Sequence, residues 1–167
     1  MTWFRFWLLL HIFTAIAAFG PTYAFGFIAG YAAKDPKNAR VVTEIIHGIE
    51  TKITIPAAVV MPFLGLALIY SGHFPLWQNT WLVIAIILYT ILFFFSVLVQ
   101  RTNTLKMIGA IERMPAPASG AAAGPPAPEV TALGKVIAMG GAFQTLLLTT
   151  IIVLMIWRPG CVGICGG

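Results

Sequence analysis

Histidine and cysteine are the residue types in this 167-residue chain that could bind a metal or a cofactor, with three and two copies respectively. His11 lies inside a long apolar stretch, where an imidazole needs either a hydrogen-bond partner or a ligand. His73 lies in a short polar segment that we expect on the same side of a membrane, so the two could approach one cofactor. The competing interpretation of His11 is a buried imidazole hydrogen-bonded to a backbone or hydroxyl group.

Glu44 and His47 form an ExxH spacing, which places both side chains on one face of a helix, with Glu50 one turn further along. Di-iron carboxylate bundles use two such motifs and two additional carboxylates. This chain has one motif and five acidic residues in total, so we expect no metal site. A solvated polar face near a membrane surface explains the spacing better, with Arg40 and Lys52 available for ion pairs.

Cys161 and Cys165 belong to a glycine-rich C-terminal segment, CVGICGG. The pair lacks the CxxCH spacing of covalent haem attachment and is too sparse for a zinc site. An oxidising compartment would permit a disulfide between the two residues. The alternative is a pair of thiols without a function.

Catalytic motifs are absent from the sequence, which contains no Walker loop, no GxSxG and no HExxH. We therefore assign no catalytic residue and favour a protein that is not an enzyme. The net charge of +5 comes from basic residues that flank apolar stretches. This arrangement favours contact with lipid headgroups over binding of nucleic acid.

Four long apolar stretches dominate the chain, whose mean hydropathy is +0.92. Only 9% of the residues are charged, against about a quarter in a soluble domain. The stretches are Trp3–Ala33, Ile53–Tyr70, Trp77–Gln100 and Val136–Trp157. Each is long enough for a transmembrane helix of about 20 residues. The sequence predicts an all-α membrane protein, a bundle of four transmembrane helices, over approximately 3–33, 38–70, 77–113 and 130–157.

The basic residues predict the orientation of this bundle. Most of them lie in the first and third gaps between the apolar stretches: Lys34, Lys37, Arg40, Lys52, Arg101, Lys106, Arg113 and Lys135. The positive-inside rule places these gaps in the cytoplasm and both termini on the non-cytoplasmic side of a cell inner (plasma) membrane. All five tryptophans fall at the expected outer interface: Trp3, Trp7, Trp77, Trp81 and Trp157.

Proline and small residues predict where the helices bend and where they pack closely. We expect Pro21, Pro56 and Pro62 to bend the first two helices, since each removes one backbone donor. Gly26 and Gly30 form a GxxxG motif, which allows another helix to approach closely. The last helix has a comparable face of small residues at Gly134, Ala138, Gly141 and Ala142.

We expect a single membrane domain over residues 1–167. The segment 115–128, PAPASGAAAGPPAP, is rich in proline, alanine and glycine and lacks the apolar side chains needed to pack. It predicts a flexible cytoplasmic linker. Residues 158–167 then form an external tail.

Several segments resemble those of a family of small bacterial four-helix integral membrane proteins of unknown function. They are LLLHIFTAIAAFG (Leu8–Gly20), LALIYSGHF (Leu66–Phe74), Trp81 and LMIWRPG (Leu154–Gly160). That family is similar in layout to CopD-like copper-resistance domains and to the haem-b protoporphyrinogen oxidase of bacteria. The second similarity implies a haem-ligating histidine in the first helix, which would be His11.

These observations leave two functional hypotheses. The first is a non-catalytic accessory or scaffold subunit of a larger membrane complex, in contact with lipid and with other membrane proteins. The second is a redox or b-type haem-binding protein that uses His11, with His73 as a further candidate ligand.

Overall fold

The computed structural model describes residues 2–34, 38–114 and 127–160, with the side chains of residue 2 and residues 32–34 left aside. Within these ranges the chain is helical and holds no strand. Four helices are long and apolar enough to cross a membrane. The prediction of an all-helical, four-span bundle is confirmed. Cys161, Cys165 and residues 115–126 of the expected linker lie outside the described part of the chain.

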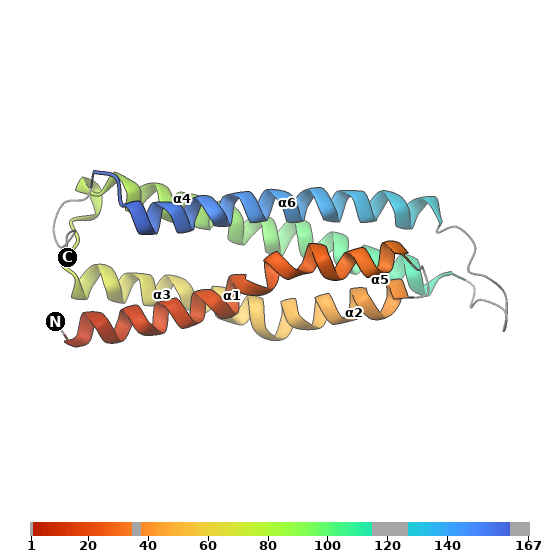
Figure 1. Ribbon diagram of the computed structural model, residues 1–167, viewed down its shortest axis with the longest axis horizontal. Helices are drawn as coiled ribbons and strands as arrows, with labels where there is room; N and C mark the ends of the chain where they lie inside the picture. The colour runs from red at the N-terminus through yellow and green to blue at the C-terminus, as the bar shows by residue number, and fades with distance from the viewer. Residues whose placement is uncertain (1, 35–37, 115–126, 161–167) are drawn as a thin grey trace.

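The four long helices run side by side along the molecule (Figure 1). The first is α1 (Thr2–Lys34). The second consists of α2 (Ala39–Ile49), the π-helical η2 (Glu50–Thr54) and α3 (Ile55–Ser71). A short 3-10 turn, η3 (Leu76–Gln78), precedes the third, which consists of α4 (Thr80–Phe94), the π-helical η4 (Phe95–Gln100) and α5 (Arg101–Glu112). The fourth is α6 (Pro128–Trp157).

The two ends of the bundle differ. We call one the turn end, where α1 begins, α3 connects to α4 and α6 stops, and the other the loop end (Figure 1). The helix Thr80–Glu112 has 33 residues and is about 50 Å long at 1.5 Å per residue. A hydrocarbon core is about 30 Å thick. The helices are therefore long enough to extend beyond the membrane.

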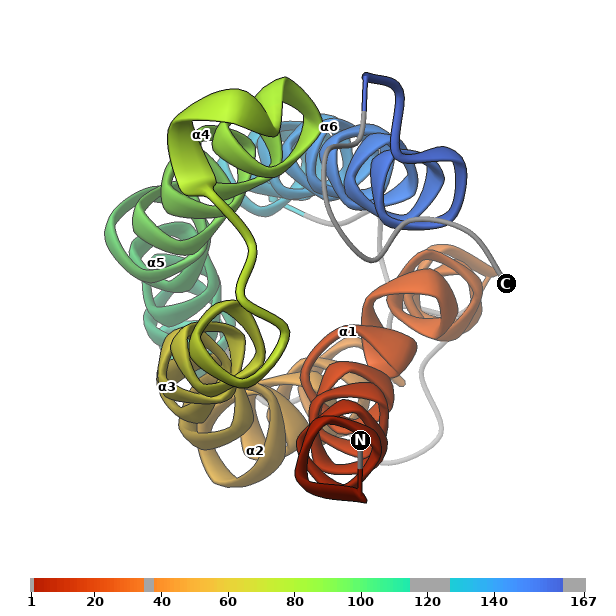
Figure 2. The same cartoon turned by 90° about the vertical axis from the view of Figure 1, so that its left-hand side faces the viewer.

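The helices form a ring when viewed along their axes (Figure 2). Helix α1 packs against α3 and α2, α2 packs against α5, and α6 packs against α4 and α5. One apolar cluster joins α1, α3 and α4 through Ala18, Ala58 and Met61, with Phe19, Tyr89 and Phe93 around it. A second joins α5 to α6 at the loop end through Ala110, Ile111 and Val130.

A network of polar and aromatic contacts closes the turn end. Asn79 is fully buried, its Nδ2 donates to the carbonyl of Pro75 at 2.9 Å, and Trp81 Nε1 donates to its Oδ1 at 3.3 Å. The ring of Trp81 lies edge-on to Phe74, at 6.2 Å between centroids. The guanidinium of Arg158, just after α6, lies 5.7 Å from the centroid of the same ring. These contacts connect the α3–α4 turn to the end of α6.

Trp81 departs from the expected belt of interfacial tryptophans. Its side chain is 4% exposed, whereas Trp3, Trp77 and Trp157 are 70%, 86% and 79% exposed. The difference has a physical cause, because the indole N–H of Trp81 finds its acceptor inside the bundle. Trp81 is therefore part of the core of the turn end.

Candidate functional site: a buried polar centre

Two π-helical segments interrupt the second and third long helices. The N–H of Ile55 bonds to the carbonyl of Glu50, and the N–H of Arg101 bonds to the carbonyl of Ser96, each spanning five residues. Pro56 lies two residues after the first segment and lacks the N–H that would extend a regular α-helix there. Single π-turns inside α-helices are frequent at functional sites because they redirect side chains.

Five polar side chains lie in or next to these segments, and we call them the polar centre. Its members are His47, Glu50, Thr54, Gln100 and Arg101. Glu50 and Thr54 are 5% and 8% exposed. Each member has one buried polar atom without a hydrogen-bond partner: His47 Nδ1, Glu50 Oε2, Thr54 Oγ1, Gln100 Oε1 and Arg101 Nε. Unpartnered buried polar atoms are rare in folded proteins, and several at one place indicate a site that takes up water or a ligand.

Opposite charges face each other across the polar centre. The positive charge of Arg101 acts on the carboxylate of Glu50. Glu50 and Arg101 are not among the ion pairs within 4.0 Å that the described residues form. A buried carboxylate without such a partner is costly. Both residues lie about 32 Å along their helices from the turn end, at 1.5 Å per residue, which is the thickness of a hydrocarbon core.

A small cavity adjoins the polar centre on its turn-end side. Its volume is about 30 Å³, enough for one or two water molecules. Every one of the four long helices contributes a polar side chain to its wall: Thr22, Thr54, Tyr89, Ser96 and Gln144. The cavity is too small for a drug-sized molecule or a cofactor ring.

A hydrogen bond at a proline closes the cavity toward the turn end. Pro62 has no N–H, so the carbonyl of Ala58, four residues earlier, loses its regular helical partner. The hydroxyl of Tyr89 on α4 donates to this carbonyl. Tyr89 and Ala58 also belong to the apolar cluster that lies beyond the cavity. Proline in α3 thus creates the acceptor that joins α3 to α4.

Gln100 connects the polar centre to α6. Its Nε2 donates to the carbonyl of Ile137 at 2.9 Å. Gly140, one turn further along α6, is buried, and a Cβ atom there would collide with Oε1 of Gln100. The two helices approach closely because position 140 carries no side chain. This close contact does not involve the packing face expected from the sequence, which was Gly134, Ala138, Gly141 and Ala142. Ala138 and Ala142 of that face are exposed.

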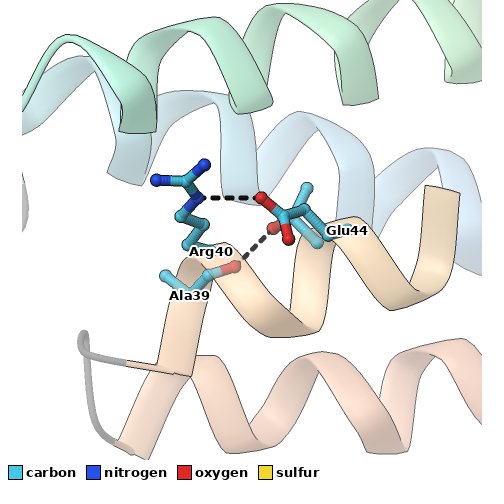
Figure 3. Close-up of polar contacts among 4 residues, drawn as sticks. Ala39, Arg40 and Glu44 are labelled. Atoms are coloured by element: carbon cyan, nitrogen blue, oxygen red, sulfur yellow. Dashed lines mark hydrogen bonds and ion pairs between the residues drawn. The ribbon is translucent and has the colours of Figure 1, made fainter. Parts of the chain in front are cut away.

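Of the two ExxH residues, His47 belongs to the polar centre, and Glu44 lies between it and the loop end. Arg40 Nε pairs with Glu44 Oε1 at 2.8 Å on the exposed side of α2, and the Thr43 hydroxyl donates to the carbonyl of Ala39 at 2.7 Å (Figure 3). The expectation of a solvated face is right for Glu44. It is wrong for Glu50, which turns inward toward Arg101. The helical spacing of Glu44, His47 and Glu50 predicted one solvated face for all three, because spacing alone does not say which side of a helix is buried.

His11 and His73 lie near the turn end but at different depths. His11 is half-buried in α1, about 14 Å from Thr2 along the helix at 1.5 Å per residue, and its Nδ1 has no hydrogen-bond partner. His73 is exposed in the α3–α4 turn with a positive φ of 50°. Neither histidine lines the 30 Å³ cavity. Groups of three or more metal-binding side chains are absent from the described residues. Nδ1 of His11, which has no hydrogen-bond partner, could serve as one axial ligand. The 30 Å³ cavity is too small to hold a haem.

The outer face of α1 is open. Gly26 and Gly30 have no atom within 4 Å of the position that a Cβ would take. Phe27 and Tyr31 flank them, 75% and 54% exposed, with their rings edge to face at 5.9 Å. The GxxxG motif is therefore not used for packing inside this chain.

Comparison with known proteins gives one result. No curated protein and no solved structure matches the chain. A family model described as "Predicted integral membrane protein (DUF2269)" matches residues 6–159. This match covers all four long helices and agrees with their length and apolar composition. The chain belongs to this family of integral membrane proteins.

Proposed function

We propose that the protein is a non-catalytic accessory or scaffold subunit that binds another membrane protein through the outer face of α1. The observation that carries the proposal is the open GxxxG motif at Gly26 and Gly30. Small residues at this spacing let two helix backbones come close enough for extensive van der Waals contact in lipid. The occupant is a transmembrane helix of a partner protein.

Burial of the helices supports the choice of α1. In its apolar stretch 6% of the residues are buried inside the chain, against 22%, 17% and 17% in the other three. Its exposed side chains include Phe13, Ile16, Tyr23 and Phe27, which form a broad apolar surface. Much of the apolar surface of α1 is therefore left for contact with a further helix.

The proposal includes a location and an orientation. The basic residues of the loop end would lie on the cytoplasmic side of the inner (plasma) membrane, with both termini on the other side. Lys106 and Arg113 at that end are exposed and available to anionic headgroups.

Replacement of the two glycines tests the proposal. Gly26→Ile with Gly30→Ile fills the open face, so partner proteins that co-purify with the wild type in mild detergent are expected to be lost. Gly65→Ile on α3, which also has open space around it, is the matched control and should keep them. Equal partner recovery from all three proteins, measured by quantitative mass spectrometry, would contradict the proposal.

A second candidate function, binding of b-type haem, rests on the buried and unpartnered Nδ1 of His11. His11 would supply one axial ligand, and His73 is the candidate for a second at the same end of the bundle. When bound, haem would supply one-electron chemistry. The test is the absorption spectrum of protein purified after haem supplementation. A Soret band that disappears in His11→Ala supports this function, and an unchanged spectrum or no band excludes it.

A further inference from the structure

Polar side chains form two continuous lines from the loop end toward the cavity. On the second long helix they are Thr43, His47, Glu50 and Thr54, spaced four, three and four residues apart, which keeps them on one helical face. On the third they are Thr104, Arg101, Gln100 and Ser96. The two helices pack against each other through α2 and α5. The two lines therefore lie on helices that are in contact near the loop end, and further in the charge of Arg101 acts on Glu50.

Several polar atoms along these lines have no partner within the protein, whereas the hydroxyls of Thr43 and Thr104 donate to backbone carbonyls. Thr54 lines the cavity, is 8% exposed and has no partner for its hydroxyl. Oε2 of Glu50 and Nε of Arg101, about one turn closer to the loop end, are also buried and have no hydrogen-bond partner. Water molecules can satisfy such atoms with two to four hydrogen bonds each, and the cavity has room for them. A larger ligand does not fit.

The opposite side of the cavity is closed. The Tyr89 hydroxyl is bound to the Ala58 carbonyl, and Ala18, Met61, Phe19 and Phe93 pack beyond it. The side chains of this cluster are alanine, methionine and aromatic residues, of which only Tyr89 carries a polar group. Water is therefore expected to reach the cavity from its loop-end side.

We infer that the polar centre is an internal water-binding site, open to the loop end and closed at the turn end, where Glu50 accepts and releases a proton. A hydronium ion in the water chain gives its proton to the Glu50 carboxylate and becomes water, and the reverse step restores the carboxylate. Arg101 on α5 and His47 on α2 are the charged or titratable groups that face Glu50. Helices α1 and α6 contribute Thr22 and Gln144 to the adjoining cavity, neither of which titrates.

Infrared spectroscopy of the full-length protein in lipid tests this site. Only five acidic residues can contribute a side-chain carboxyl band, so assignment is tractable. Over a pH series we expect a protonated-carboxyl C=O band that shifts when H2O is exchanged for D2O and is lost in Glu50→Gln. Glu44→Gln, an exposed carboxylate paired with Arg40, is the matched control and should retain the band. A band that survives in Glu50→Gln, does not shift in D2O or is absent at every pH would overturn the inference.

Two further pairs of variants keep the test informative if Glu50→Gln does not fold. Thr54→Val removes one hydroxyl from the cavity without changing the shape of the side chain, and it should shift the C=O band of Glu50. Thr51→Val, exposed on the same helix, should leave the band in place. His47→Phe at the loop-end entry should delay the D2O shift, whereas Tyr70→Phe at the turn end should not. Equal effects within either pair would contradict water binding or entry from the loop end, respectively.

Discussion

Single residues in this protein act mainly through backbone groups that lack a regular partner. Pro62 removes one donor from α3, and the Tyr89 hydroxyl takes its place at the Ala58 carbonyl. The sequence predicted that prolines would disturb this helix, since the missing N–H is a property of the residue itself. The identity of the replacement donor, 27 positions further along the chain, could not be predicted because it depends on how α3 packs against α4.

The hydrogen bond between Tyr89 and Ala58 can be measured with a double-mutant cycle. Tyr89→Phe is expected to lower the free energy of unfolding by about 1 kcal/mol, since a buried carbonyl loses its donor. In a Pro62→Ala background the backbone N–H of residue 62 can serve that carbonyl, so the same change should cost less. Unfolding in mixed micelles gives both values, and equal costs in the two backgrounds would contradict the coupling.

Gly140 and Gly141 provide a matched pair on α6. A Cβ at position 140 collides with the Gln100 side chain, whereas one at position 141 meets no atom within 4 Å. Gly140→Ala is expected to break the bond from Gln100 to Ile137 and to be about 1 kcal/mol less stable than Gly141→Ala. Both changes bring the same gain in helix propensity, so their difference isolates the contact. Equal stability of the two variants would refute it.

At the scale of elements, the helices were predictable and their interruptions were not. Apolar stretches of sufficient length predicted four spans because lipid requires every backbone group to be satisfied within the helix. The π-helical segments η2 and η4 lack a comparable signal, although Pro56 stands next to one of them. The polar centre escaped prediction for the same reason. Glu50 and Arg101 lie in different gaps between the apolar stretches, and only helix packing brings them together.

Helices α5 and α6 extend about 16 Å beyond Arg101 toward the loop end, at 1.5 Å per residue, where water can reach them. Burial of apolar groups should hold them together there. Ile111→Ala is expected to lower the free energy of unfolding by about 2 kcal/mol or more. Glu129→Gln breaks the exposed ion pair with Arg113 (3.2 Å). This change should alter the free energy of unfolding by about 0.5 kcal/mol at most. A larger effect of Glu129→Gln than of Ile111→Ala would contradict this order.

At the scale of the whole molecule, the bundle has a closed turn end and a polar interior that opens toward the loop end. Trp81, Asn79 and Arg158 close the turn end, and the polar interior contains Glu50 and Arg101 and reaches the cavity beyond them. The charge distribution along the sequence predicted that the two ends would differ. It could not predict that polar groups would continue inward from the loop end, because the side of each helix that turns inward depends on how α2 and α5 pack.

The outer surface of the bundle is apolar over most of its length, and the open face of α1 lies within it. The measurement that tests assembly most directly is native mass spectrometry of the protein extracted with its surrounding lipid, without denaturation. A complex that contains a second membrane protein, and therefore exceeds the 18.1 kDa of this chain alone, is the expected result. A lone 18.1 kDa monomer at every protein level would contradict the role as an accessory subunit.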